Sequence, residues 1–261
     1  MLLRMCLALS HLSIIMIYPV VIIPVTYLMM KKCLLFCIGL FLFEFSFGQI
    51  TSLPPRNETS NDLALGTFTD QLKTAVQKKD VEWIIQHLDK DVMPSFEGQA
   101  DIQSFITDWD IRNDSSEFWP MITIALNLGG VFLHDTADMT GRYQFVFPYA
   151  YDLQLNENDD PYYTGVITGK NVNLRKSPDT KSAIVTQLTY DIIRFMQNKQ
   201  GELLTKSNAG GTVEWFKIQT YNKSHQGWVN SKFVYSLMGP RLFLFKDKHG
   251  DWKISAFITG E

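Results

Sequence analysis

The sequence predicts an α+β protein: an amino-terminal domain of helices and sheet, followed by a small all-β barrel. Apolar residues recur at helical spacing between residues 63 and 128. Short β-branched and aromatic runs, divided by Gly, Asn and Ser turns, occupy residues 165–235, which is typical of a small barrel. Two further apolar runs near the carboxyl terminus flank a Gly-containing loop and indicate a β-hairpin.

The first 48 residues are mostly apolar and resemble an export leader. Met29-Met30-Lys31-Lys32 gives a positive start, Cys33–Phe43 an apolar run, and Ser46-Phe47-Gly48 a small-residue cleavage site. We therefore expect a cleavable signal peptide ending near Gly48, with the true start near Met30, and an extracytoplasmic (periplasmic or secreted) bacterial protein. The alternative is a membrane anchor made from residues 1–48, because the apolar run before Met30 is long enough to span a bilayer.

Charge and cysteine content exclude several classes of protein. The chain has 24 basic and 27 acidic side chains, a net charge of −3, so we expect no nucleic-acid partner. All three cysteines, Cys6, Cys33 and Cys37, lie in the leader. A mature chain from Gln49 therefore has no disulfide and no thiol nucleophile. We expect membrane contact only through an uncleaved leader.

Residues 49–62 are polar and contain Pro54-Pro55, which indicates a disordered linker. Apolar spacing then predicts a helix over 67–79, and Asp80 can cap a second helix that extends to Leu88. Val92–Phe96 reads as a short extended segment. This part of the chain therefore begins an α+β domain.

We place this domain at residues 63–163, and local signals also predict its remaining helices and strands. Asp101 caps a third helix, whose apolar residues are spaced by three and four positions: Ile102, Phe105, Ile106 and Trp109. Another helix runs over residues 116–128 and ends at Gly129-Gly130. Strands are expected at 131–133 and 143–147.

The carboxy-terminal hairpin pairs residues 241–245 with 252–258. An isolated hairpin is marginal in water and must pack against something else. We expect it to return to the sheet of the first domain. The α+β domain is then 63–163 plus 239–261, with the barrel at 164–238 as an insertion.

Three ordered motifs in the barrel segment point to a family. They are Val172-Asn173-Leu174-Arg175 followed by Pro178, then Trp215-Phe216-Lys217-Ile218, then Gly227-Trp228-Val229 with Phe233-Val234. In this order they resemble the bacterial Src-homology-3 (SH3b) domain. The resemblance implies a non-enzymatic binding barrel in a cell-envelope protein, with peptidoglycan, a peptide or an envelope protein as partner. The amino-terminal domain is similar to uncharacterised domains paired with such barrels, and loosely similar to nuclear-transport-factor-2-like cones.

The candidate ligand-binding residues are aromatic and polar side chains of the barrel. Aromatic side chains dominate binding hot spots because they bring large area at low entropic cost. The candidates are Trp215, Arg175, Asn173, Tyr190, Tyr221 and Trp228. By the resemblance, Trp215 lines the groove, Trp228 braces the last strand, and Arg175 could pair with a ligand carboxylate. Core packing is the alternative for both tryptophans.

The segment also departs from the simplest SH3b pattern at two places. The loop Gln197–Gly211 is long, which affects the shape of any groove. Asp191 replaces the glycine expected after Thr189-Tyr190.

We expect no catalytic residue, metal or cofactor. His87 and His134 lie near aspartates, but neither cluster has the spacing of a zinc site. The paired carboxylates Asp108 with Asp110 and Asp159 with Asp160 lie in polar stretches typical of exposed surface. Two alternatives remain open: a small-ligand or unrecognised enzymatic cavity in the α+β domain, and a structural role in which the barrel packs against its own first domain.

Overall fold

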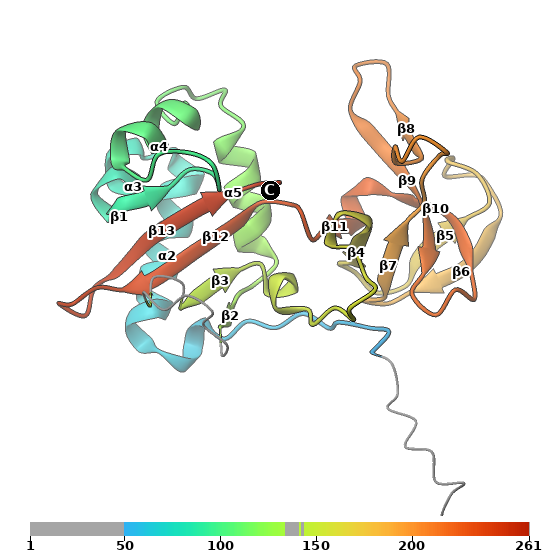
Figure 1. Cartoon of the computed structure of the whole chain (residues 1–261), viewed down its shortest axis with the longest axis horizontal. Helices are drawn as coiled ribbons and strands as arrows, with labels where there is room; N and C mark the ends of the chain where they lie inside the picture. Colours follow the sequence, from blue (N-terminus) through green and yellow to red (C-terminus); the bar gives the residue numbers. More distant parts are fainter. Residues whose placement is uncertain (1–49, 134–140, 142–143, 261) are drawn as a thin grey trace, which may run out of the picture. The chain divides into compact units, whose positions relative to one another are not determined.

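The computed structural model describes residues 50–133, 141 and 144–260. The signal-peptide prediction, the three cysteines and His134 lie outside these residues. Within them, no helix combines the length and the apolar character needed to cross a membrane. The same residues also bring together no group of three or more potential metal ligands. Figure 1 shows the course of the chain.

The described part of the first domain contains four α-helices, and an aspartate stands directly before three of them. They are α2 (Leu63–Lys78), α3 (Val81–His87), α4 (Ile102–Asp108) and α5 (Phe118–Asn127). Asp62, Asp80 and Asp101 each accept a hydrogen bond from a backbone N–H of the first turn of α2, α3 and α4. Such a bond satisfies one of the amide groups left without a partner at a helix start. The helix that the sequence predicts from residue 67 therefore begins earlier, at Leu63.

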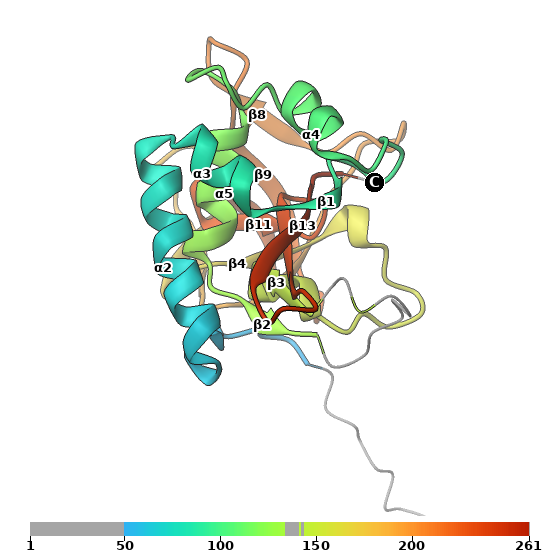
Figure 2. The same ribbon diagram turned by 90° about the vertical axis from the view of Figure 1, so that its left-hand side faces the viewer.

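A five-stranded sheet lies against these helices. Its strand order is β1 (Leu88–Met93), β13 (Trp252–Ile258), β12 (Arg241–Lys246), β3 (Phe145–Phe147) and β2 (Val131–Phe132). β1 runs parallel to β13 and the other pairs are antiparallel. The carboxy-terminal hairpin thus occupies the middle of the sheet, and Figure 2 shows α2, α3 and α5 along one side of it.

The space between helices and sheet is filled by a core of aromatic and aliphatic side chains. Phe118 of α5 makes edge contacts with Phe105 of α4 and Phe257 of β13, at ring-centre distances of 5.9 and 5.3 Å. Trp109 donates its indole N–H to the carbonyl groups of Pro94 and Phe257. Trp109, one of the apolar residues predicted along one face of the third helix, therefore links the end of α4 to β13.

An eight-stranded antiparallel sheet lies between β3 and β12 in the chain, and we call its residues, 164–236, the barrel. Seven strands follow the order β11 (Val234–Ser236), β4 (Thr164–Ile167), β7 (Ile192–Phe195), β9 (Val213–Thr220), β10 (Gln226–Asn230), β5 (Val172–Arg175) and β6 (Ile184–Leu188). β8 (Thr205–Ser207) pairs with β9. Alternate residues, including Leu174, Ile218 and Val229, form its own small core.

The segment 50–62 differs from the disordered linker that its composition indicates. Its backbone is hydrogen-bonded at both ends: Leu53 N–H donates to the Tyr190 carbonyl at 2.7 Å, and Glu58 N–H donates to the Gly130 carbonyl at 2.8 Å. A short 3-10 turn, η1 (Thr59–Asn61), then leads into α2. Polar composition did not reveal these partners because they lie far away in the sequence.

A second difference concerns Leu88, which the sequence places in a helix. The structure ends α3 at His87 and begins β1 at Leu88, which pairs with Ile254 of β13. His87 donates its Nδ1–H to the Trp83 carbonyl at 2.7 Å, and its ring stacks on Trp83 at 3.8 Å. His87 therefore closes the helix by packing.

Candidate functional site

A row of polar and aromatic side chains crosses the outer face of the barrel. Side chains two apart in a strand, and side chains opposite one another across a ladder, share a face. Asn173 and Arg175 lie two apart on β5; Trp228 of β10 lies opposite Arg175, and Lys217 of β9 lies opposite Trp228. All four are half-buried. We call Asn173, Arg175, Trp228 and Lys217 the barrel row.

The neighbouring hairpin orients the β5 end of the barrel row. Arg175 donates through Nη1 to the Ser182 carbonyl at 2.6 Å, and Gln187 of β6 donates to Asn173 Oδ1 at 3.1 Å. These bonds hold both side chains along the sheet surface. A guanidinium beside an indole can bind a carboxylate and pack against a sugar or peptide face.

Trp215 shares this face, but the structure covers it. It lies on β9, opposite Asn230 of β10 on one side and Lys206 of β8 on the other, and only 6% of its surface is exposed. The long loop that departs from the simple SH3b pattern supplies β8, so β9 is paired along both edges. The other candidate, Trp228, is the more exposed of the two tryptophans.

Tyr190 and Tyr221 lie away from the barrel row. Tyr190 occupies the turn after β6 with a φ of 58°, a left-handed conformation that favours glycine, and its carbonyl holds Leu53. Asp191, which stands where a glycine was expected, accepts the Thr189 N–H at 2.5 Å and so stabilises the turn. Tyr221 is buried. The structure therefore groups Asn173, Arg175, Trp228 and, by its face, Trp215, and separates the two tyrosines from them.

Tyr221 belongs instead to a polar cluster with Asp159, Arg194 and Asn156. Asp159 accepts hydrogen bonds from Arg194 Nη2, the Tyr221 hydroxyl and the Asn156 amide. The Arg194 guanidinium lies 4.3 Å from the centre of the Tyr221 ring and donates to the Tyr221 carbonyl at 3.0 Å. Only 2% of the Asp159 side chain is exposed. We call these four residues the Asp159 cluster.

Electrostatics explain why the Asp159 carboxylate is stable in this place. Burial raises its pKa, but hydrogen bonds from Arg194, Tyr221 and Asn156 outweigh burial, so the pKa of Asp159 lies below its ordinary value. The exposed position expected for Asp159 is wrong, and a glycosidase role is not supported by a carboxylate already held by an arginine. No local signal in the sequence connects Asp159 with Arg194, because 35 residues separate them.

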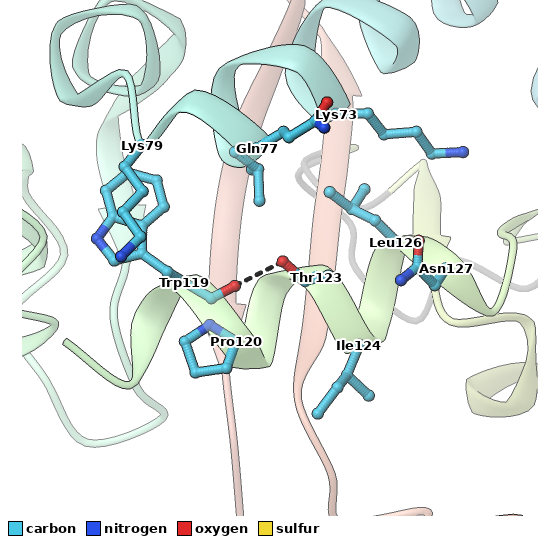
Figure 3. Close-up of a pocket in the computed structure, with 10 residues that line it drawn as sticks. Lys73, Gln77, Lys79, Trp119, Pro120, Thr123, Ile124, Leu126 and Asn127 are labelled. Atoms are coloured by element: carbon cyan, nitrogen blue, oxygen red, sulfur yellow. Dashed lines mark hydrogen bonds between the residues drawn. The ribbon is translucent and has the colours of Figure 1, made fainter. Parts of the chain in front are cut away.

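The first domain carries a groove of about 690 Å³ between α2 and α5 (Figure 3). Val76, Ile124 and Leu126 give it an apolar lining, and Lys73 and Lys79 supply positive charge. Thr123 donates to the Trp119 carbonyl, which leaves its hydroxyl oxygen as an acceptor on the groove wall. Val76, Trp119 and Leu126 belong to the hydrophobic core, so the groove borders the packed core between the two helices.

Comparison with known proteins identifies one part of the chain. A family model described as "Bacterial SH3 domain" matches residues 170–235. No curated protein and no solved structure matches the chain. The barrel is therefore a bacterial SH3 domain, as the three motifs predicted, and it is the β part of an α+β protein. A domain of this kind indicates a binding role.

Proposed function

We propose that the protein is a non-enzymatic envelope protein whose SH3 barrel binds cell-wall peptide, glycan or an envelope protein through the barrel row. The observation that carries the proposal is the alignment of Arg175, Trp228 and Lys217 across three neighbouring strands. Two cations that flank an indole match a ligand with a carboxylate and a flat apolar or sugar face. Peptidoglycan contains both peptide carboxylates and sugars.

Co-sedimentation with isolated peptidoglycan tests this proposal. Arg175→Ala with Lys217→Ala should reduce retention by about tenfold, the effect of losing charge-assisted hydrogen bonds. The matched control is Lys90→Ala with Lys248→Ala, which removes two exposed cations from the first domain and should leave retention unchanged. Equal retention of both double variants would exclude the barrel row, and absence of pelleting by the unmodified protein would exclude the wall as the partner.

Trp228→Ala should also weaken retention, with a melting temperature close to that of the unmodified protein. If retention stays intact while the melting temperature falls, Trp228 is a packing residue and the ligand binds elsewhere. The same pair of measurements on Trp215→Ala should give the opposite pattern, because Trp215 is buried.

The proposal includes export and the absence of catalysis. The apolar leader supports export by a signal peptide cleaved near Gly48; a secreted chain that begins before Gln49 would contradict it in amino-terminal sequencing. Two contacts support a non-catalytic role: Asp159 is held by Arg194, and His87 is stacked on Trp83. Release of soluble fragments from peptidoglycan during the sedimentation assay would show an enzyme instead.

The groove between α2 and α5 favours a second candidate, a small-ligand role for the first domain. Its volume falls within the roughly 300–1,000 Å³ of small-molecule sites. A ligand screen by thermal shift tests the groove, because a ligand bound to the native state raises the melting temperature; Ile124→Glu should abolish a hit that binds there.

A further inference from the structure

A second hollow, of about 480 Å³, lies outside both the barrel row and the α2–α5 groove. It is built where the chain passes between β3 and β4, and again between β11 and β12. We call it the Arg241 pocket. The side chains that shape it include Phe96, Tyr151, Leu155, Tyr162, Met238 and Arg241.

Exposed aromatic side chains are concentrated at this pocket. Phe96 is 51% exposed, and Tyr151 and Tyr162 are each 40% exposed. These are three of the seven strongly exposed large hydrophobic side chains in the described residues. Scattered exposed hydrophobics need no explanation, but a group around one hollow indicates a surface that another molecule covers.

The pocket also contains a buried arginine whose hydrogen bonds are incomplete. Arg241 is the first residue of β12 and is 5% exposed. Its Nη2 donates to the Gly260 carbonyl, while its Nε is buried without a partner among the described residues. The guanidinium carbon lies 5.5 Å from the centre of the Phe96 ring, one of the exposed walls of the pocket.

Among the described residues, no carboxylate forms an ion pair with Arg241. Burial lowers the pKa of the guanidinium, yet arginine stays protonated in proteins. The other charged side chain of the pocket is Glu97, which is exposed and forms no ion pair with Arg241 in the described residues. A buried charge without a counter-ion costs stability, and an incoming anion would recover part of that cost.

The backbone around Arg241 is fixed, so the pocket does not depend on a loose loop. Gly260 N–H donates to the Met238 carbonyl at 2.9 Å, and the Tyr235 hydroxyl donates to the Pro240 carbonyl at 3.0 Å. Leu237 N–H donates to Thr164 at 3.2 Å. The floor of the pocket and the arginine therefore belong to one hydrogen-bonded unit.

We propose that the Arg241 pocket binds an anionic amphiphile, a molecule with one carboxylate or phosphate head and an apolar body. The head would pair with Arg241 Nε and Nη, which present donors in a fork that suits two oxygens. The apolar body would cover Leu155 and the three exposed aromatic rings. This site is independent of the barrel row and adds a second ligand to the protein.

Dodecanoate, held below its micelle concentration, is the probe, and its affinity is measured by calorimetry on the purified protein. Dodecanol and dodecyltrimethylammonium have the same tail with a neutral or a cationic head. The unmodified protein should bind dodecanoate at least about tenfold more tightly than either, because a charge-assisted hydrogen bond contributes that factor. Equal affinity for the three probes, or no binding of dodecanoate, would overturn the proposal.

Variants locate the site. Arg241→Gln should bind dodecanoate and dodecanol equally, whereas Arg241→Lys should keep a preference for the anion. Because Arg241 is buried and its replacement can disturb folding, Phe96→Ala with Tyr162→Ala provides a second test on exposed positions. This double variant should weaken dodecanoate binding about tenfold, while Ile50→Ala with Ile184→Ala, which removes two exposed side chains outside every proposed site, should not. The reverse pattern would place the probe outside the pocket.

A vesicle experiment distinguishes two sources of the anionic head, a lipid head group and a soluble amphiphile. The protein is sedimented with phosphatidylglycerol vesicles and with phosphatidylcholine vesicles. Arg241-dependent pelleting with phosphatidylglycerol supports a lipid head group as the natural ligand. Binding of free dodecanoate without pelleting supports a soluble amphiphile. A protein that binds neither dodecanoate nor phosphatidylglycerol has no such site.

Discussion

Two arginines stacked on aromatic rings behave in opposite ways in this molecule. In the Asp159 cluster, Arg194 lies over Tyr221, and a nearly fully buried carboxylate completes its hydrogen bonds. In the Arg241 pocket, Arg241 lies over Phe96, but its Nε has no partner among the described residues. The Asp159 carboxylate neutralises the first arginine, whereas the second lines a hollow and has one donor unpaired among the described residues.

This contrast shows that burial alone does not identify a binding residue. Arg241 is almost completely buried and Arg194 is 28% exposed, yet we assign the ligand to Arg241. The deciding property is whether the charge already has a counter-ion. A satisfied pair holds the fold, while an unsatisfied donor beside exposed aromatic rings indicates a place for another molecule.

The largest loss of stability should come from removing the carboxylate of the Asp159 cluster. Asp159→Ala removes the acceptor shared by Arg194 and Tyr221 and leaves both donors without it. We expect a loss of about 3 kcal/mol in the free energy of unfolding, the lower end for removing one partner of a buried pair. Urea unfolding measures this loss. Glu157→Ala, on an exposed residue of the same segment, should stay within about 0.5 kcal/mol, and an equal loss in both variants would mean that the segment, rather than the pair, is responsible.

Local sequence signals predicted the parts of this fold that depend on neighbouring residues. Asp101 capped α4 as expected, and Gly129, with a φ of 79°, follows α5 where the Gly-Gly stop was predicted. The three SH3b motifs identified the barrel. Each of these signals lies within one element or one short motif, so a single stretch of sequence contains it.

The features that sequence could not show depend on distant partners. Leu88 continues a helical pattern, but pairing with Ile254 makes it a strand residue. Trp215 is only 6% exposed although it shares a face with the half-buried Lys217, and no motif predicts this difference. Nothing in the adjacent Asp159 and Asp160 reveals which of them will meet Arg194. Sequence analysis also missed Lys217 as a member of the barrel row, because its position opposite Trp228 follows from strand register.

A smaller effect, a difference of about 2 kcal/mol in the free energy of unfolding, should separate variants of the two arginines. Arg194→Met leaves Asp159 buried with one charge partner lost, so the free energy of unfolding should fall by about 3 kcal/mol. Arg241→Met leaves no carboxylate behind, and removing an uncompensated charge offsets the lost bond to Gly260. We expect a change of about 1 kcal/mol or less for Arg241→Met in the same urea titration. Equal losses would show that Arg241 is as structural as Arg194, and the contrast between the two regions would then fail.

The smallest effect is a pH dependence carried by Asp159. Because the folded pKa of Asp159 lies below its ordinary value of about 3.9, the cluster stabilises the protein fully above that pH. The stabilisation begins to be lost near pH 4, where the unfolded chain takes up its proton, and is fully lost only below the lower pKa of the folded carboxylate. Asp159→Asn cannot titrate, so its unfolding free energy should fall less than that of the unmodified protein between pH 5 and pH 3, by up to about 1 kcal/mol. Urea titrations across this range measure the difference between the two proteins, which cancels the other carboxylates with lowered pKa values, Asp62, Asp101 and Asp247. Parallel curves would mean that Arg194 and Tyr221 do not favour the charged form of Asp159, and that this cluster, like the Arg241 pocket, holds a charge without a matched partner.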